Sequence, residues 1–222
     1  MVSVIICSCL NKPERLEYLD RCVKNIKYIF DNNVEILIAF DKHGMEIEDT
    51  VCYTHNKGMG HSWNWGIQNA KNDYILQIED DWVIEIGGAN QENLPTKESF
   101  FHHLENRIKV LEKNDGFFKF THLGDDIYKT GKTELDMDGY KFLEWKKSEK
   151  FMLNTWEIYR YSNQPHLKKK SFHDDIGYYL ENEPPHKVEV DMCYKLHLSD
   201  KRVYSCPFFT FVHIGRESSR EK

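Results

Sequence analysis

The sequence has no long hydrophobic stretch. Its longest apolar runs, Val4–Cys7 and Ile36–Phe40, are far shorter than the ~20 residues that a membrane-spanning helix needs. The first residues carry no basic segment and no cleavage-like site, which argues against a secretory signal. No Asn-x-Ser/Thr sequence occurs either. We therefore expect a cytoplasmic protein without a transmembrane segment.

Excess positive charge is also missing. The 222 residues include 30 Lys and Arg against 36 Asp and Glu, which gives a formal net charge of −6. Proteins that bind nucleic acid usually present a basic face, so this balance argues against a nucleic-acid partner. It leaves room for a phosphate compound, because an acidic protein can bind one through a bridging divalent cation.

Two common site types have no match. The 6 cysteines are scattered without the spacing of a disulfide framework or a zinc site, so we expect reduced thiols. No Gly-x-x-x-x-Gly-Lys-Ser/Thr loop is present, which argues against a P-loop enzyme. Gly58–Trp63 begins like a dinucleotide fingerprint, but Trp63 stands where that motif needs a glycine.

What the first third of the chain does contain is an alternation of strands and helices. Apolar runs that predict buried strands lie at Val2–Cys7, Glu35–Phe40 and Tyr74–Ile78. Helical spacing follows Pro13 and recurs from Ser62 to Lys71, while Cys52–Gly60 has the composition of a turn-rich loop. Repeated strand–helix units predict an α/β fold with a mostly parallel central sheet flanked by helices.

The second half is less regular. The sequence pattern predicts helices over Lys97–Lys113 and Val188–Leu198, a strand over Gly116–Thr121, and a strand pair within Val203–His213. We expect a single domain over 1–222. Its parts would be a ligand-binding half (1–86), an irregular half (87–215) and a flexible tail (216–222).

Polar clusters follow the three predicted strands of the first third, at Ser8–Asn11, Asp41–His43 and Glu79–Asp81. Open α/β sheets bind ligands at the carboxyl ends of their strands. Three adjacent carboxylates there suit a hard divalent metal such as Mg²⁺ or Mn²⁺. Taken alone, such an acidic run is more often a solvated turn.

The order of segments resembles the core of GT-A glycosyltransferases, in particular the family 2-like inverting enzymes. In that family an Asn-x-Gly loop and an Asn-x-Gly-Ile helix, here within Asn56–Ile67, lead into a strand that ends in the DXD metal motif, here Asp73–Asp81. Ser3–Leu16 looks like the family's opening strand and loop. The resemblance covers residues 2–86 and thins through 90–185. It implies a GT-A, Rossmann-like fold with an acceptor-binding second half.

The resemblance also implies roles for single residues. Glu79-Asp80-Asp81 matches an acidic variant of the metal motif, with Asp81 as metal ligand and Glu79 and Asp80 near the ribose or metal-bound water. The other residues implied to bind the nucleotide-sugar in this half are Ser8, Asp41 and Asn56. Asp41 is followed by Lys-His-Gly where the family often has Asp-x-Ser, which leaves the nucleotide base open.

The last strand adds three more candidates. Phe211–Gly215 resembles a strand that ends in a metal-binding histidine in many GT-A enzymes, which implies His213 as a second metal ligand. Arg216 and Arg220 follow it and are expected to approach the diphosphate. A lone histidine is also compatible with a purely structural role.

An inverting transferase needs a general base that deprotonates the acceptor hydroxyl. In the family this base lies just before a helix of the C-terminal half, which implies Glu189 or, two residues on, Asp191. Both would lie at the N-terminus of the helix predicted over Val188–Leu198, where the macrodipole favours an anion. We favour Glu189, with Asp174 and Asp175 as a weaker alternative.

Aromatic side chains of the second half are candidates for stacking on an acceptor sugar. They are Trp145, Trp156, Tyr159 and Tyr161.

The sequence thus predicts a glycosyltransferase dependent on Mn²⁺ (or Mg²⁺). It would transfer a sugar from a nucleotide-sugar donor, UDP-sugar favoured, to a hydroxyl of an acceptor glycan with inversion. One alternative is a nucleotidyltransferase, although Ser8–Pro13 lacks the glycine-rich loop of those enzymes. The other is a non-catalytic nucleotide- or sugar-binding module, and further domains of a longer polypeptide are compatible with either alternative.

Overall fold

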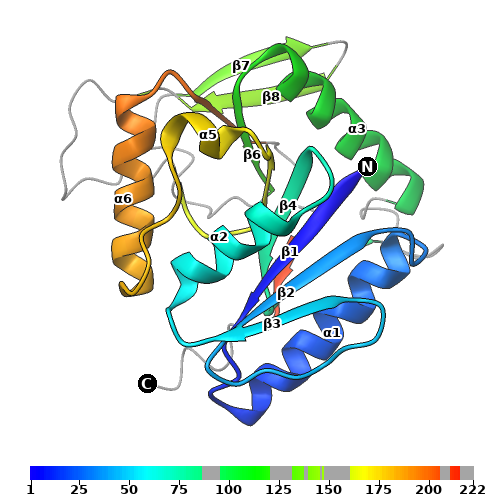
Figure 1. Cartoon of the computed structure of the whole chain (residues 1–222). Coiled ribbons are helices and arrows are strands. Elements are labelled where there is room, and N and C mark those ends of the chain that lie inside the picture. Colours follow the sequence, from blue (N-terminus) through cyan, green and yellow to red (C-terminus); the bar gives the residue numbers. More distant parts are fainter. Residues whose placement is uncertain are drawn as a thin grey trace.

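A computed structural model describes residues 1–86, 96–120, 132–137, 140–145, 147, 161–205 and 211–215. The first part of the chain alternates strands and helices (Figure 1). Its elements are β1 (Val2–Ser8), α1 (Pro13–Ile29), β2 (Glu35–Asp41), β3 (Val51–His55), α2 (Met59–Asn69), β4 (Tyr74–Glu79) and β5 (Trp82–Ile84). Pro13 begins α1, because its fixed φ and missing N–H suit the first position of a helix. The three predicted buried strands are confirmed as β1, β2 and β4.

The second part adds helices, further sheet strands and a hairpin. Its elements are α3 (Lys97–Lys113), β6 (Gly116–Lys119), β7 (Lys132–Met137), β8 (Tyr140–Trp145), β9 (His166–Lys169), α5 (Phe172–Ile176), α6 (Pro185–Leu198), β10 (Arg202–Ser205) and β11 (Phe211–His213). The predicted helix over Lys97–Lys113 is confirmed, and the Thr96 side chain caps it by accepting a hydrogen bond from the Ser99 N–H at 3.2 Å.

Most of the strands form one sheet of nine in the order β3-β2-β1-β4-β9-β6-β10-β8-β7. Neighbours from β3 to β4 are parallel, and so are β6 and β10. Strands β9 and β8 pair antiparallel with both of their neighbours and so run against the other strands. The predicted α/β fold with a mostly parallel sheet is therefore confirmed. The sheet passes without a break from strands of the first part to strands of the second.

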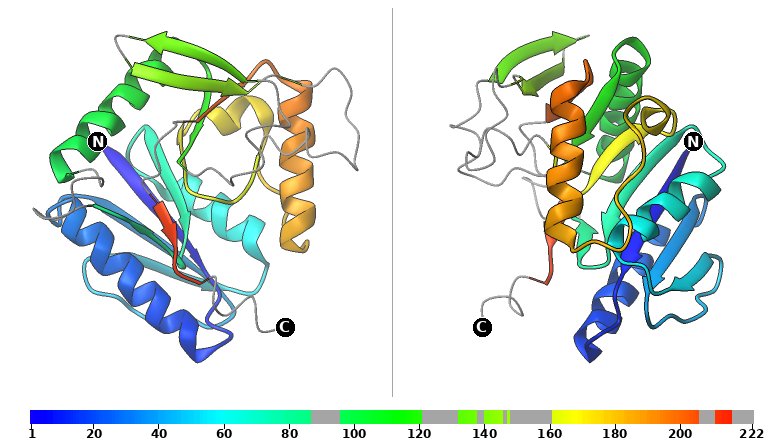
Figure 2. Two further views of the ribbon diagram at one scale, coloured as in Figure 1. Left: turned by 180° about the vertical axis from the view of Figure 1, so that it is seen from behind. Right: turned by 60° about the vertical axis from the view of Figure 1, so that its left-hand side comes forward.

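Helices cover both faces of this sheet (Figure 2). Val4 and Ile6 of β1 lie in the core formed with α1 and α3, whereas Ile5 and Cys7 lie in the core formed with α2, α5 and α6. Because both faces are covered, every residue of β1 is buried, which explains its continuous apolar run. Among the described helices, none combines the length and apolar character needed to cross a membrane.

Some local predictions are wrong. Cys52–Gly60 is not a loop throughout, because Val51–His55 forms the edge strand β3, where half-exposed polar residues are tolerated. The predicted pair within Val203–His213 divides between two sheets, since β10 joins the main sheet and β11 pairs with β5. Helix α6 begins at Pro185 rather than Val188, as proline favours the first helical position.

Candidate functional site

The carboxyl ends of β1, β2 and β4 meet at one edge of the sheet. Ser8 pairs in register with Phe40 of β2, and Cys7 pairs with Glu79 of β4. The chain turns directly after β4, and the Ser8 hydroxyl donates a 2.5 Å hydrogen bond to Asp80 Oδ2. Parallel pairing thus brings together polar residues that lie far apart in the sequence, as the sequence predicts.

Glu79, Asp80 and Asp81 form an acid cluster at this edge. Asp80 is fully buried and Asp81 almost so. Arg15, from the first turn of α1, contacts Asp80 Oδ1 through Nη2 and lies 2.7 Å from Asp81 Oδ2 through Nη1. One guanidinium therefore pairs with both aspartates. Sequence reasoning assigned no role to Arg15, because nothing in the sequence indicates a contact across this separation.

The positive charge of Arg15 does not fully offset the burial of the acid cluster. Burial, and next the charge of Asp81, raises the pKa of Glu79 to about 8, while Arg15 opposes the rise. Burial raises the pKa of Asp80 to about 7, against Arg15 and the Ser8 hydrogen bond. Additional positive charge at the cluster would therefore favour the ionised form of both carboxyl groups.

Strand β11 places the last described residues against the cluster. Its pairing with β5 sets His213 opposite Trp82, and the two rings meet edge to face with centroids 4.8 Å apart. His213 Nε2 lies 3.4 Å from Asp81 Oδ2, and the Ile214 N–H donates a 2.8 Å hydrogen bond to the Asp81 carbonyl. A Cβ at Gly215 would lie 2.8 Å from Asp81 Oδ2, so only glycine fits there without displacement.

A cavity of about 480 Å³ opens beside the cluster. Four of its lining residues come from the elements just described or from predicted binding positions: Arg15, Asp41, Asn56 and Glu79. Lys42, Lys57 and the 182–185 segment line the remainder together with neighbouring residues. The predicted residues Asp41, Asn56 and Glu79 thus share one cavity, and Arg15 joins this cavity to the aspartates behind it.

Asp41, the last residue of β2, is held from the side of α2. Asp41 Oδ1 accepts a 3.2 Å hydrogen bond from the N–H of Gly58, the residue before α2, whose φ of 79° favours glycine. His55, at the end of β3, bonds Ser62 of α2 at 2.9 Å through Nε2 and accepts the Lys57 N–H through Nδ1 at 3.1 Å. Burial lowers the pKa of His55. This wall of the cavity is therefore fixed by the strand-to-helix turn.

The two candidate bases of α6 differ in their surroundings. Glu189 Oε1 accepts a 2.9 Å hydrogen bond from the Asn163 N–H, and burial raises the pKa of Glu189. The negative charge of Glu189 also contributes to the raised pKa of Glu79. Asp191 instead pairs with Lys195, one turn on, at 2.7 Å.

The predicted position of both bases at a helix N-terminus is wrong. Since α6 begins at Pro185, Glu189 and Asp191 lie beyond its first turn, where the macrodipole has faded. Of the weaker candidates, Asp174 is exposed and Asp175 pairs with Lys201. None of the four candidate bases lines the cavity itself.

A second polar cluster, buried beneath α5, was not foreseen. Lys168 of β9 is 1% exposed and donates 2.7 Å hydrogen bonds to Gln77 Oε1 and Tyr179 Oη. Tyr179 Oη lies 2.7 Å from Tyr161 Oη, which donates to Asn163 Oδ1 at 3.2 Å. We call these five residues the lysine network. Burial lowers the pKa of Lys168, and none of the described carboxylates pairs with it.

The lysine network ends close to the cavity. Asn163, its last member, binds Glu189 through its backbone N–H, and its side-chain amide lies 2.9 Å from Met59 Sδ. Met59 lines the cavity. Asn163 therefore lies between Glu189 and Met59 of the cavity wall.

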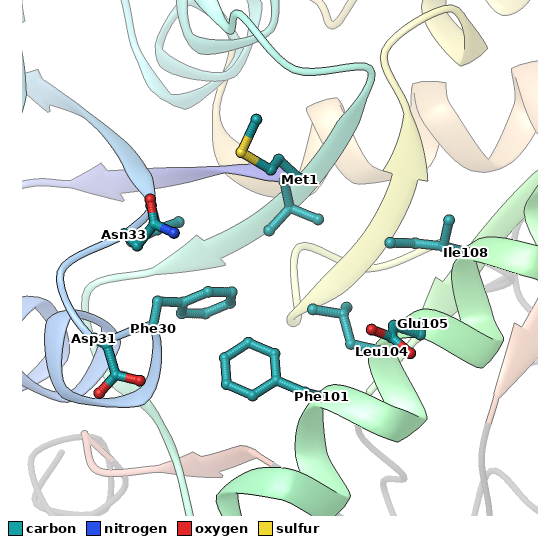
Figure 3. A pocket seen from close by; sticks show the side chains of 10 residues that line it. Met1, Phe30, Asp31, Asn33, Phe101, Leu104, Glu105 and Ile108 are labelled. Carbon is teal, nitrogen blue, oxygen red and sulfur yellow. The ribbon is translucent and has the colours of Figure 1, made fainter.

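A further cavity of about 340 Å³ lies at the other end of the strands, between the start of β1 and α3. Phe30, Phe101 and Leu104 point into it, with Asp31 and Glu105 at its sides (Figure 3). It holds no cluster of catalytic or metal-ligating side chains. The carboxyl-end cavity is therefore the candidate site.

Several predicted residues fall elsewhere. Trp145 and Tyr161 are buried in the core, so the prediction that they stack on an acceptor sugar is wrong. Trp145 donates to Ser205 Oγ at 2.8 Å, and Tyr161 belongs to the lysine network. The other predicted residues, Trp156, Tyr159, Arg216 and Arg220, lie outside the described residues, as does the 216–222 tail.

The donor set at the acid cluster has the chemistry of a divalent-metal site. Asp81 Oδ1 is buried, and no described residue donates a hydrogen bond to it. Carboxylate oxygens with an imidazole nitrogen suit Mn²⁺ or Mg²⁺. In the described residues, however, no group of three or more His, Cys, Asp or Glu side chains is arranged to hold a metal. The aspartates pair with Arg15 instead.

Comparison with known proteins identifies a solved structure with a similar fold. No family model matches the chain, and no curated protein matches its sequence. Among solved structures it is similar to a mannosyltransferase from Pyrobaculum calidifontis in complex with GDP-Man and Mn²⁺, with a TM-score of 0.54 and 14% identity. The match covers 93% of this chain and 54% of that one, so this chain spans about half the length of the mannosyltransferase. The chain thus has a Rossmann-like α/β fold that a glycosyltransferase also uses.

Proposed function

We propose that the chain is a metal-dependent glycosyltransferase that transfers a sugar from a nucleotide-sugar to a hydroxyl of an acceptor glycan with inversion. The observation that carries the proposal is the Asp80–Asp81 pair, which ends a parallel strand directly beside a 480 Å³ cavity lined by Asp41 and Glu79. The fold shared with a nucleotide-sugar mannosyltransferase supports it.

In this proposal the donor lies in the carboxyl-end cavity. Asp41 and Asn56 contact the nucleoside, and Ser8 holds Asp80 in place. Asp81 and His213 hold Mn²⁺ or Mg²⁺, while Glu79 and Asp80 face the ribose or metal-bound water. When bound, the cation would offset the negative charge on the leaving diphosphate.

Glu189 is the proposed general base. Its raised pKa makes it a stronger base than an ordinary glutamate, and the Asn163 N–H orients one of its oxygens. Asp191 is the second candidate, although its pairing with Lys195 weakens its case. Residues 1–86 would bind the nucleotide, residues 87–215 would bind the acceptor, and Arg216 would approach the diphosphate.

A binding panel tests the donor class. Thermal unfolding is measured with UDP, GDP, UDP-sugars and GDP-mannose, each with and without Mn²⁺. We expect the UDP series to raise the melting temperature only when Mn²⁺ is present. GDP-mannose is included because the similar mannosyltransferase binds it. Stabilisation by the GDP series alone would move the donor class to GDP-sugars, and no metal-dependent stabilisation would overturn the proposal.

Asp81→Ala tests the metal ligand. We expect transfer to fall roughly 100-fold or more, because several kcal/mol of charge stabilisation is lost, and the Mn²⁺-dependent thermal shift to vanish. Asp20→Ala is the matched control, since Asp20 lies on the exposed side of α1 and, among the described residues, pairs with Lys24 alone. Full transfer with unchanged Mn²⁺ dependence in Asp81→Ala would refute the assignment.

Turnover separates the alternatives. A glycosyltransferase releases nucleoside diphosphate from a nucleotide-sugar as the sugar passes to the acceptor hydroxyl or, without an acceptor, to water. A nucleotidyltransferase would release pyrophosphate from a nucleoside triphosphate and a sugar phosphate. A non-catalytic module would bind nucleotide and release neither product.

A further inference from the structure

Arg15 has contacts on two sides. Its guanidinium pairs with Asp80 and Asp81, and its side chain also lines the carboxyl-end cavity. The Arg15 side chain is 24% exposed, whereas those of Asp80 and Asp81 are 0% and 11% exposed. The His213 side chain is about equally exposed, at 23%, but His213 does not line the cavity, so Arg15 is the partner of Asp81 that has room to turn into the cavity.

Two cations cannot share the same face of Asp81. Arg15 Nη1 lies 2.7 Å from Asp81 Oδ2, and His213 Nε2 approaches this oxygen to 3.4 Å. A metal ion bound between Asp81 and His213 would take this oxygen, and its charge would repel the guanidinium. A metal ion that binds Oδ2 between Asp81 and His213 therefore competes with Arg15 for this oxygen, while Oδ1 has no hydrogen-bond donor among the described residues.

We propose that Arg15 and a divalent cation compete for the Asp80–Asp81 pair, and that the displaced guanidinium turns into the cavity to bind the donor diphosphate. This inference rests on the proposed function. A planar guanidinium forms paired hydrogen bonds with phosphate as readily as with carboxylate. Metal and donor are then coupled, because the metal releases the group that the diphosphate needs.

The test measures Mn²⁺ binding to the nucleotide-free protein, by the electron paramagnetic resonance signal of free Mn²⁺. Arg15→Met removes the competitor, so we expect Mn²⁺ to bind about tenfold more tightly or better, because the acids are no longer occupied. Arg15→Lys, which keeps the charge but lacks the planar fork, should fall between wild type and Arg15→Met.

The second measurement is nucleotide affinity at saturating Mn²⁺, by calorimetry with UDP and with GDP. In Arg15→Met we expect the affinity for the bound nucleotide to fall about tenfold, since one charged contact to the diphosphate is lost. One substitution thus strengthens metal binding and weakens nucleotide binding. An arginine with a purely structural role would weaken both.

Lys42→Met is the matched control. Lys42 lines the same cavity but has no ion pair with Asp80 or Asp81. If loss of any nearby positive charge strengthened Mn²⁺ binding, Lys42→Met would do so as well. We expect its Mn²⁺ affinity to stay within about twofold of wild type, as a screened charge without direct contact contributes little. A gain equal to that of Arg15→Met would overturn the competition.

Other outcomes also decide the matter. Unchanged or weaker Mn²⁺ binding in Arg15→Met, or no Mn²⁺ binding to either protein, overturns the proposal. Tighter Mn²⁺ binding in Arg15→Met, together with no sugar transfer by the wild-type protein from any donor, would support the competition and refute the proposed function. Sugar transfer by the wild-type protein, together with an unchanged Mn²⁺ affinity in Arg15→Met, would support the proposed function and overturn the competition.

Discussion

Strand β4 contributes to two buried clusters that contain ionisable groups, and the two clusters differ in their partners. Gln77 and Glu79 lie two residues apart on β4 and so point to the same side of the sheet. Gln77 belongs to the lysine network, where the buried Lys168 amine is surrounded by neutral amide and phenol groups. Glu79 belongs to the acid cluster, where negative charge is offset by the partly exposed Arg15.

The two clusters differ in whether a ligand can replace the partners of the buried ionisable group. The partners of Lys168 in the lysine network are themselves buried in the core. The charge of Lys168 is therefore controlled only by its lowered pKa. In the acid cluster the counter-charge borders a cavity, where a ligand can replace it. A buried charge with neutral partners is suited to hold structure, and one with an exchangeable partner is suited to bind.

Glu189 lies between the two clusters and gives the largest expected effect. It accepts the N–H of Asn163 from the lysine network, and its charge contributes to the raised pKa of Glu79 in the acid cluster. We expect Glu189→Gln to lower kcat about 10²–10⁴-fold, the usual value of a general base, with Mn²⁺ and nucleotide affinity unchanged. Single-turnover kinetics with saturating donor measure it.

The pH profile supplies an independent readout of Glu189. A base works only when deprotonated, and burial raises the pKa of Glu189. Activity should therefore decline as pH falls through a value above the ordinary glutamate range, and Glu189→Gln should remove that limb. An equal loss in Asp191→Asn, with Glu189→Gln active, would transfer the role to Asp191.

Lys168→Met tests whether burial in the lysine network lowers the pKa of Lys168. Burial lowers the folded-state pKa of Lys168, so between that value and the ordinary lysine pKa the unfolded chain binds the extra proton. In wild type this term makes stability rise with pH, by up to about 1.4 kcal/mol per pH unit within that window. The variant should lose this rise.

Urea unfolding at several pH values between 7 and 10 measures the effect. The stability of Lys168→Met relative to wild type should be most favourable at pH 7 and decline toward pH 10. A difference that does not vary with pH would mean that Lys168 is charged in the folded protein. The comparison between the two clusters would then fail.

Ser8→Ala has the smallest expected effect and tests the acid cluster. Loss of the hydrogen bond to Asp80 should cost about 1.5–3 kcal/mol in unfolding free energy and raise the pKa of Asp80 further. Ser3→Ala is the matched control, because Ser3, at the other end of β1, donates an equal 2.5 Å bond to Glu35. Only Ser8→Ala should weaken Mn²⁺ binding, and an equal loss in Ser3→Ala would contradict the local effect.

The core strands and the acids at their ends were predictable, because a strand covered on both faces has a continuous apolar run. Val2–Ser8 and Tyr74–Glu79 show this pattern, and parallel pairing then brings their ends together. Strand β9 gives no such signal. Its sequence, His-Leu-Lys-Lys, is polar, and Lys168 is buried only because Gln77 and Tyr179 satisfy it.

The site was predictable in part for a related reason. Position after a strand identified Ser8, Asp41 and Glu79, since topology alone brings these together. The pairing of Arg15 with the aspartates depends on how α1 packs, and the start of α6 depends on Pro185, so neither follows from strand position. The roles of Asp81 and His213 toward a metal stay predictions.

The pairing of β5 with β11 has a consequence for biosynthesis. Synthesis is vectorial, and early segments can begin to fold before later ones exist. Arg15 is made before Asp80 and Asp81, so it is available as their counter-ion as soon as β1 and β4 pair. His213 and Gly215 reach Asp81 only after β11 emerges and docks on β5. Arg15 can thus pair with the acids before His213 has been synthesised.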